Sequence, residues 1–473
     1  MQLKETISAL AEQNEQLILD MNNAVWDFAE AGMREHRSAQ YIAEAMRQQG
    51  FAVTEGVSGI PTAFVAEWGE GKPIIGFLGE YDALPGLSQK ADAARHEEVA
   101  PGAYGHGCGH NSLGAGAAGA ALTLRDYLKQ TGKSGTVRYY GCPGEEYGSG
   151  KTFMARDGLF DDLDACFTWH PVDATLVVGT RSLACISAFF TFKGRTAHAA
   201  AAPHLGRSAL DACELMSVGV NYLREHMTSD ARVHYAYTDA GGIAPNVVQD
   251  HVKVHYFVRA PRTADMMALY ERVKKVAYGA AMMTETEVEI RVHEALSDYM
   301  PNRVLDAVMQ QSLEEIGAPA FDEADRALAA EFRATFSVEE IKSFYKDLED
   351  RGLEHDFIPA DAVLCDRVLP YYGSEKSTGG STDVGDASYC APTSQINVAT
   401  MALGTPGHSW QLTGQGKSGM AHKGTMVAAK VLALTAAKMI DAPELLADAK
   451  AELLRKNGGG YVCPIPADVM PTL

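Results

Sequence analysis

Between residues 187 and 298, the hydrophobic pattern of this 473-residue chain differs from the pattern on either side. On both sides, short apolar runs alternate with amphipathic segments, which is typical of a sheet flanked by helices. Within residues 187–298, the order strand, helix, strand, strand, helix, strand suits a small open sheet with two helices on one face. A chain of this length also exceeds what one hydrophobic core usually supports. The sequence therefore predicts an α/β protein whose smaller domain is inserted into a larger one.

The expected boundaries follow from these changes of pattern. Residues 1–186 and 299–473 would form the larger domain, and residues 187–298 the smaller α+β domain. Residues 318–378 are charged, helical and irregular by turns, which indicates a peripheral insertion. Two helices are expected within residues 1–50. The strands expected in the larger, mixed sheet are 73–78, 136–141, 165–169 and 396–403. In the smaller domain, the patterns predict strands at 189–193, 252–258 and 287–292 and helices at 205–225 and 266–282.

Charge and hydropathy exclude two classes of partner. The net charge of −20 and the absence of any Lys/Arg-dense stretch argue against nucleic acid. No apolar run approaches the roughly 18 residues that a membrane span needs, and the first ten residues lack a secretory pattern. The eight cysteines are scattered without a framework spacing, which indicates reduced thiols and a cytoplasmic protein.

The motif Gly105-His-Gly-Cys-Gly-His-Asn111 places a thiol and an imidazole two residues apart in a glycine-rich loop. Cys108 and His110 could converge there on one metal ion. A buried structural thiol beside a helix cap explains the same residues equally well. Alone, the motif leaves both interpretations open.

The motif Gly141-Cys-Pro-Gly-Glu-Glu-Tyr-Gly148 places two carboxylates side by side after an expected strand. Adjacent carboxylates repel one another unless a cation compensates them. Because adjacent side chains point in different directions, one could bind a metal while the other faces a substrate as a general base. A solvated acidic turn is the alternative for an isolated pair.

Three further polar side chains follow expected strands. His170 stands before a proline that we expect to end its strand, and His408 follows a strand through a Gly/Pro turn. Asp82 lies just beyond the strand at 73–78 and could orient an imidazole ligand. Each is unremarkable alone, but cysteine, histidine and glutamate at successive strand ends point jointly to a metal site. Mixed sulfur, nitrogen and oxygen donors favour zinc or manganese over calcium or magnesium.

In this order, the motifs resemble those of the metal-dependent aminoacylase/carboxypeptidase amidohydrolases, specifically the branch with a cysteine ligand. The likeness covers nearly the whole chain and is clearest over residues 60–300 and 379–424. It implies a catalytic domain interrupted by a lid domain that also forms a homodimer, and a related second subunit is a further expectation. The implied activity is hydrolysis of the amide bond of an N-acyl amino acid, with glutamate expected as the amino acid.

The resemblance also implies roles for individual residues. Cys108 would bridge two divalent ions, Mn²⁺ or Zn²⁺, and Glu145 would be the general base. The remaining ligands would be His110, Glu146, His170 and His408.

In the lid, the resemblance implies three functional residues. His198, within Gly194-Arg-Thr-Ala-His-Ala199, would reach the neighbouring subunit's active site and stabilise the oxyanion. Asn246 would contact the substrate carbonyl, and Arg259 would bind the substrate carboxylate.

The sequence departs from the family pattern at its N-terminal motif, where Phe28-Ala-Glu-Ala31 keeps Glu30 but lacks a proline. His422, in Ala421-His-Lys-Gly424, is a rival to His408 as the last ligand, and His408 is favoured because it directly follows a strand. Two other classes stay open: a catalytically inactive partner subunit, and an amidase with Cys108 as nucleophile. No Gly-x-Gly-x-x-Gly turn indicates a dinucleotide enzyme.

Overall fold

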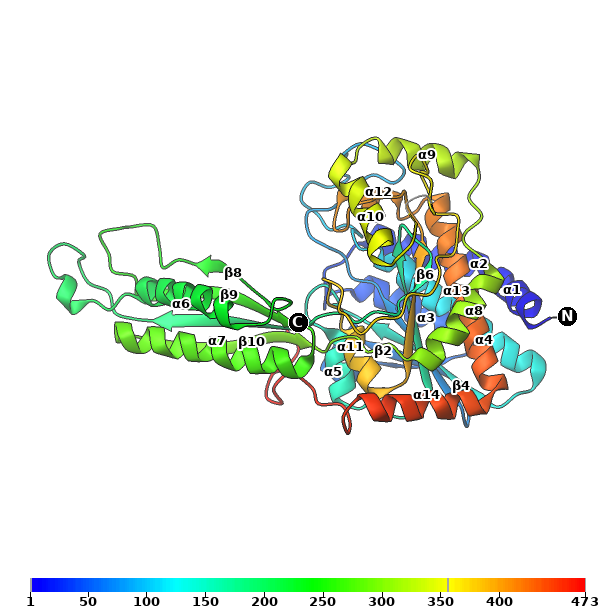
Figure 1. Ribbon diagram of the computed structural model, residues 1–473, viewed down its shortest axis with the longest axis horizontal. Coiled ribbons are helices and arrows are strands. Elements are labelled where there is room, and N and C mark those ends of the chain that lie inside the picture. The colour runs from blue at the N-terminus through cyan, green and yellow to red at the C-terminus, as the bar shows by residue number, and fades with distance from the viewer. Residues whose placement is uncertain (1, 355–356, 473) are drawn as a thin grey trace.

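A seven-stranded mixed sheet forms the centre of the larger part of the molecule (Figure 1). The computed structural model describes residues 2–354 and 357–472. The sheet order is β1-β2-β4-β3-β5-β11-β6, in which β4, β3, β5 and β11 run parallel and the other strands are antiparallel to their neighbours. The strands are β1 (Ala52–Glu55), β2 (Phe64–Glu70), β3 (Ile74–Glu80), β4 (Gly135–Cys142), β5 (Ala165–Val172), β6 (Leu176–Val177) and β11 (Thr393–Ala399).

Helices cover both faces of this sheet, which confirms the predicted fold class. The apolar core of one face includes α1 (Leu3–Gln13), α2 (Glu15–Phe28), α3 (His36–Gln48), α4 (His110–Thr131), α8 (Arg303–Ile316) and α13 (Gly419–Asp441). The other face packs against α5 (Gly150–Arg156) and α11 (Val384–Cys390). The remaining helices of this part are α9 (Glu323–Arg333), α10 (Val338–Asp350), α12 (Trp410–Gln415) and α14 (Pro443–Lys456). Within the described residues, no helix is long and apolar enough to cross a bilayer.

The prediction of two helices within residues 1–50 is wrong, because three are present. α1 and α2 are separate helices that meet at Asn14. The Asn14 side chain donates to the carbonyl oxygen of Leu10 at 3.0 Å and to Asp126 at 3.0 Å. This side chain thus satisfies a carbonyl at the end of α1 while α2 starts in a new direction.

The smaller part, which we call the lid, extends away from the larger part (Figure 1). Its four-stranded antiparallel sheet has the order β10-β7-β9-β8. The lid elements are β7 (Ala184–Lys193), α6 (Ala209–Leu223), β8 (Arg232–Asp239), β9 (His251–Ala260), α7 (Thr263–Thr284) and β10 (Glu287–Leu296). Alternate residues of β9, from Val252 to Ala260, are buried against α6 and α7, and no helix within the described residues covers the opposite face of the sheet.

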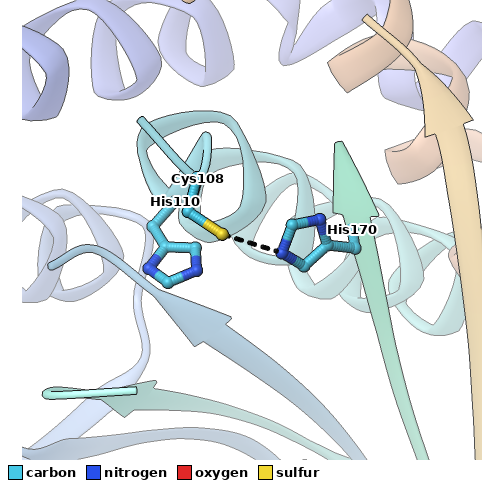
Figure 2. Close-up of side chains that lie close together, drawn as sticks. All are labelled: Cys108, His110 and His170. Atoms are coloured by element: carbon cyan, nitrogen blue, oxygen red, sulfur yellow. Dashed lines mark hydrogen bonds between the residues drawn. The ribbon is translucent and has the colours of Figure 1, made fainter. Parts of the chain in front are cut away.

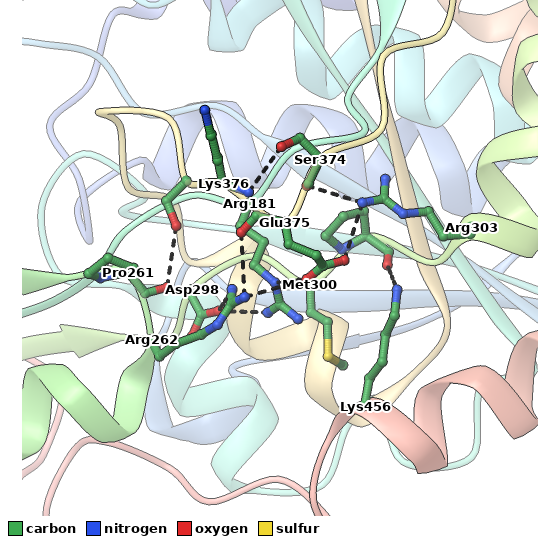
Figure 3. A network of polar contacts seen from close by, with 12 residues as sticks. Arg181, Pro261, Arg262, Asp298, Met300, Arg303, Ser374, Glu375, Lys376 and Lys456 are labelled. Atoms are coloured by element: carbon green, nitrogen blue, oxygen red, sulfur yellow. Dashed lines mark hydrogen bonds and ion pairs between the residues drawn. The ribbon is translucent and has the colours of Figure 1, made fainter. Parts of the chain in front are cut away.

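Charged residues join the lid to the larger part at its root (Figure 3). Asp298, after β10, is fully buried and pairs with Arg181 at 2.8 Å and with Arg262 at 3.5 Å. Glu375 contacts the same two arginines and also Arg303 of α8. Glu375 belongs to the segment interpreted from sequence as a peripheral insertion, so this segment takes part in the connection between the two parts.

Candidate metal centre and active site

The parallel strands bring the sequence motifs to one edge of the sheet. Asp82 follows β3, Glu145 and Glu146 follow β4, and His408 follows β11. His170 lies within β5, which continues through Pro171 to Val172, so the expectation that the proline ends this strand is wrong. β3 pairs only with the first three residues of β5, so the later residues of β5 have no strand partner on that side. Pro171, which has no N–H to donate, faces this unpaired side, so the strand loses no hydrogen bond there.

Cys108, His110 and His170 form a first group of candidate ligands (Figure 2). Their ligand atoms lie within 4.8 Å of one another, and the Cys108 sulfur is 3.4 Å from Nε2 of His170. Gly109 makes this approach possible because its φ of +80° suits glycine. A Cβ at this position would also lie 2.6 Å from Pro171.

Cys108, Glu146 and His408 form a second group, so the thiol is common to both. Nε2 of His408 lies 3.2 Å from Oε1 of Glu146. His408 has a φ of +53°, a region that side-chain-bearing residues rarely occupy. Strain of this kind often accumulates where a side chain must point in a fixed direction.

The donor atoms of both groups fit a pair of divalent cations. Nε2 of His110 and Oε1 of Glu146 are buried, and neither makes a hydrogen bond of good geometry among the described residues. The nearest polar atoms are those of other charged side chains: Glu80 lies 3.2 Å from the His110 nitrogen and His408 lies 3.2 Å from the Glu146 oxygen. Buried polar atoms left in this way are rare in folded proteins unless an ion or water completes them. Burial raises the pKa of the Cys108 thiol, so a thiolate at this position needs a compensating cation.

Asp82 orients both groups. Its Oδ1 is 2.7 Å from Nδ1 of His110, and its Oδ2 accepts from the backbone N–H of Glu146 at 2.8 Å. The imidazole of His110 therefore presents Nε2 to the site, as expected for a ligand fixed by a carboxylate partner.

His422 lies outside both groups. Its Nε2 is 2.8 Å from the side-chain oxygen of Asn23, and it lines a separate depression near α9 and α13. Between the two rivals, the structure therefore places His408 and not His422 beside Cys108 and Glu146.

Glu145 borders the cluster and faces the cavity beside it. Its Oε2 lies 3.9 Å from Nε2 of His110. Burial raises the pKa of Glu145 well above its usual range, and the carboxylates of Glu80 and Glu146 raise it further. For Glu146, burial opposes ionisation, but His408 and His110 together lower its pKa. The neighbouring carboxylates thus have different environments, as paired groups with different roles require.

A buried charged cluster behind the site escaped the sequence analysis. Lys151 is fully buried and lies 2.7 Å from Glu80 and 2.5 Å from Asp383. The other oxygen of Glu80 lies 3.2 Å from Nε2 of His110. In the sequence, the signal for this cluster is the presence of charged residues after the Glu-Glu motif and in the Ser-Thr-Asp segment at 381–383. Which of them pair with one another depends on the fold.

Replacing Lys151 by methionine is expected to lower the free energy of unfolding by about 3–5 kcal/mol, because two carboxylates would lose their buried counter-charge. Urea unfolding of metal-free protein, monitored by circular dichroism, measures this change. The exposed Lys346→Met provides the control and should change stability by less than about 0.5 kcal/mol. Equal effects of the two substitutions would show that the cluster carries no such penalty.

A second missed residue supports the loop that holds Glu145 and Glu146. Glu35 is fully buried, and its carboxylate accepts from the backbone N–H of Gly144 at 2.7 Å and from Thr62 at 3.0 Å. Burial and the nearby Asp82 raise the pKa of Glu35 to about 8. Glu30, the residue that remains of the family's N-terminal motif, instead accepts backbone N–H groups at the start of α3.

A cavity of about 520 Å³ opens beside the cluster and lies between the two parts of the molecule. Its walls include Glu145 from the larger part and Phe257, Arg259 and Glu294 from the lid. Arg259 donates to the Ser381 hydroxyl at 2.9 Å, but its buried Nε has no partner among the described residues. An arginine with an unused donor in a cavity is suited to a carboxylate.

The structure does not bring His198 and Asn246 to this cavity. Both lie beyond the distal end of β7 and β9, whereas Arg259 lies at the root, opposite Cys185. Ten residues of strand span about 30 Å, so the two residues are far from their own chain's cluster. They are neighbours of one another, since Ala199 donates its N–H to the carbonyl of Asn246 at 2.9 Å.

Comparisons with known proteins agree with this architecture. Residues 76–358 match the family described as Peptidase family M20/M25/M40. Over 466 residues, the chain is 46% identical to one of the subunits of p-aminobenzoyl-glutamate hydrolase from Escherichia coli (strain K12), covering 98% of this chain and 97% of that protein.

Two solved structures share the fold. An aminobenzoyl-glutamate utilization protein from Klebsiella pneumoniae superposes with a TM-score of 0.57 at 19% identity, covering 91% of this chain and 98% of that one. A dinuclear metal-binding peptidase of the M20 family from Bacillus subtilis superposes with a TM-score of 0.54 at 15% identity, covering 89% and 99%.

Proposed function

The chain belongs to the M20/M25/M40 peptidase family, and we propose that this metal-dependent amidohydrolase cleaves p-aminobenzoyl-glutamate into p-aminobenzoate and glutamate. The observation that supports this substrate most strongly is the near-full-length identity of 46% to the E. coli hydrolase. The arrangement of the site supports the same class of reaction, because five metal-ligand side chains converge beside an arginine-containing cavity.

Cys108 would be the shared ligand of two ions, Mn²⁺ or Zn²⁺. One ion would be held by the group with His110 and His170, and the other by the group with Glu146 and His408. Divalent ions held in this way acidify water and polarise the amide carbonyl. Mixed thiolate, imidazole and carboxylate donors suit these metals. Glu80, His110 and Glu145 form a third group of possible ligands. In this proposal Glu80 stays paired with Lys151, and Glu145 serves as the general base.

Glu145 accepts the proton of the attacking water and delivers it to the leaving amine nitrogen. Its raised pKa suits a group that must hold a proton between these two steps. Arg259 binds the carboxylate of the leaving glutamate through a charge-assisted contact, for which its unpartnered Nε is available.

His198 acts on the active site of the neighbouring protomer. Its Nδ1 accepts the backbone N–H groups of Ala200 and Ala201 at 3.2 and 3.1 Å. In the neutral ring, the proton therefore resides on Nε2, which becomes an oriented donor for the oxyanion. Asn246 reaches the substrate carbonyl from the same end of the lid.

A homodimer formed through the lids would bring these residues to the neighbouring protomer. β8 is an edge strand, and Tyr235 and Tyr237 on it are 38% exposed. Val218 and Tyr222 of α6 are 50% and 76% exposed. An open strand edge beside exposed apolar side chains is typical of an interface. Because the E. coli relative is named as one of a hydrolase's subunits, we propose a related second protein as a further partner. Eight free cysteines favour the cytoplasm.

The substrate is tested by incubating Mn²⁺- or Zn²⁺-loaded protein with p-aminobenzoyl-glutamate and measuring p-aminobenzoate by chromatography. Wild-type protein should cleave this substrate and prefer it to its α-carboxamide analogue. Arg259→Ala should lower kcat/KM for the free acid by about tenfold or more, because a charge-assisted pair is worth about 1.5–3 kcal/mol. The carboxamide should be affected far less. Equal losses on both would assign Arg259 a structural role, and no cleavage with either metal would contradict the proposed substrate.

The shared active site is tested by mixing two inactive homodimers, His198→Ala and Glu145→Ala. Random exchange makes half of the dimers mixed, and each mixed dimer has one intact site of two if His198 acts across the interface. About a quarter of wild-type activity should then return. If native mass spectrometry shows exchanged dimers while the mixture stays inactive, His198 does not act across the interface.

A further inference from the structure

The sheet of the larger part forms one wall of the catalytic cavity, beside the candidate ligand His170. Asn397 of β11 lies opposite His170 of β5 and opposite Leu176 of β6, so these three side chains share one face of the sheet. Gln395 faces the same side two residues earlier, and its carbonyl oxygen accepts the N–H of Val178 at 2.8 Å. All five residues line the cavity. We call Leu176, Val178, Gln395 and Asn397 the amide wall.

The two amide side chains of this wall are available to a ligand. Ile396 and Val177 alternate with the wall residues and are buried in the apolar core on the opposite face of the sheet. Gln395 and Asn397 are only half-buried, and neither side-chain amide has a hydrogen-bond partner in the part of the chain that the structure describes. Neighbouring amides without partners, flanked by apolar side chains in a cavity, are suited to a ligand that brings its own hydrogen-bonding group.

The amide wall itself carries no charge, and the arginines of the cavity that lie outside the lid are already paired. Arg181 pairs with Asp298 at 2.8 Å and with Glu375 at 2.9 Å. Arg351 pairs with Asp347 at 2.7 Å. The acidic residues and the remaining arginine that line the cavity belong to the metal centre, its support or the lid: Glu80, Glu145, Glu146, Glu294 and Arg259. The composition of the amide wall therefore favours a neutral group over an ion.

The amide wall and Arg259 lie on different sides of the metal centre. Arg259 donates to Ser381, and Ser381 lies two residues before Asp383, which belongs to the buried charged cluster at the end of β3. In the sheet, β3 lies on one side of β5, whereas β11 and β6 lie on the other. Neighbouring strands are about 4.8 Å apart, so the wall extends about 10 Å from β5 towards the sheet edge. A substrate with its glutamate at Arg259 and its carbonyl at the metal centre would extend its acyl group along the amide wall.

We propose that the amide wall binds the acyl group of the substrate and selects a flat apolar ring with a neutral amino group at its far end. The proposal rests on the proposed function, because the glutamate site at Arg259 sets the direction of the substrate. Gln395 and Asn397 are about 6.6 Å apart along one strand, so both side-chain oxygens can accept from one amino nitrogen between them. Leu176 and Val178 supply apolar contacts for the ring.

The test compares p-aminobenzoyl-glutamate with p-methylbenzoyl-glutamate, in which a methyl group of similar size donates no hydrogen bond. Wild-type protein should prefer the amino substrate by about tenfold in kcat/KM, as expected for two neutral hydrogen bonds. In Gln395→Met and in Asn397→Leu, this ratio should fall to about threefold, because each variant loses one acceptor but keeps a side chain of similar shape. The double variant should show a ratio near one. Because both substrates are measured on the same sample, the ratio does not depend on the fraction of active protein.

The control variant is Gln40→Met, which makes the same chemical change at an exposed position of α3 and should keep the wild-type ratio. A second comparison replaces the glutamate of the substrate by aspartate, and the preference for glutamate should be the same in wild-type protein and both wall variants. An unchanged amino-to-methyl ratio in both wall variants would overturn the inference, as would a changed preference between glutamate and aspartate in its place. Failure of metal-loaded wild-type protein to cleave either aroyl-glutamate would instead contradict the proposed function.

Discussion

Replacing Glu145 by glutamine is expected to lower kcat by about 10³-fold, because glutamine has the same shape but cannot accept a proton. Glu145 faces the cavity and is 13% exposed, and its Oε2 lies 3.9 Å from the nearest imidazole nitrogen of the cluster. In its proposed role, Glu145 accepts a proton and is not a ligand, so its replacement should remove no donor from the two groups that contain Cys108. The metal content of Glu145→Gln should therefore equal that of wild-type protein.

Glu146→Gln is the matched comparison, since the same chemical change is made one residue later. Glu146 belongs to the group with Cys108 and His408, so this variant should lose bound metal as well as activity. Mass spectrometry of metal content, with steady-state kinetics on the same samples, separates the two variants. Near wild-type turnover in Glu145→Gln, or loss of metal from it, would contradict the assignment of roles.

The sequence predicted the sheet strands that carry the motifs because each is a short apolar run followed by glycine or proline. It did not locate β1, β2, β6 or β8. β1 and β8 are largely exposed, and β6 has only two residues, so their hydrophobic patterns are weak. The break at Asn14 was missed for a related reason, since the helical spacing continues on both sides of it.

The candidate ligands could be predicted because each motif combines a chemically reactive side chain with an expected strand end. The resemblance implied that Cys108 is shared by two metal positions, and in the structure its sulfur lies in both groups of candidate ligands, while metal binding itself stays a prediction. The support behind the ligands could not be predicted. The contact of Glu35 with Gly144 joins residues more than 100 positions apart, and the contact of Lys151 with Asp383 joins residues more than 200 positions apart. Neither spacing nor composition gives a signal for contacts of this kind.

The position of His198 shows a different limit of sequence reasoning. The motif around it is recognisable, but only the structure shows that a strand of ten residues separates it from its own chain's cluster. The role proposed for this histidine therefore depends on a dimer, and the mixing experiment tests it separately from the metal centre.

The central claim is that hydrolysis depends on two divalent ions that share Cys108. Wild-type protein should be stripped with a chelator and then titrated with Mn²⁺ or Zn²⁺, while bound metal and hydrolysis of p-aminobenzoyl-glutamate are measured on the same samples. We expect almost no activity in the metal-free protein, because water without a metal is about eight to nine pH units too weak an acid. Activity should return as the metal content approaches two ions per chain, and Cys108→Ala should bind fewer ions. Full activity in metal-free protein would contradict the claim and favour a cysteine nucleophile instead.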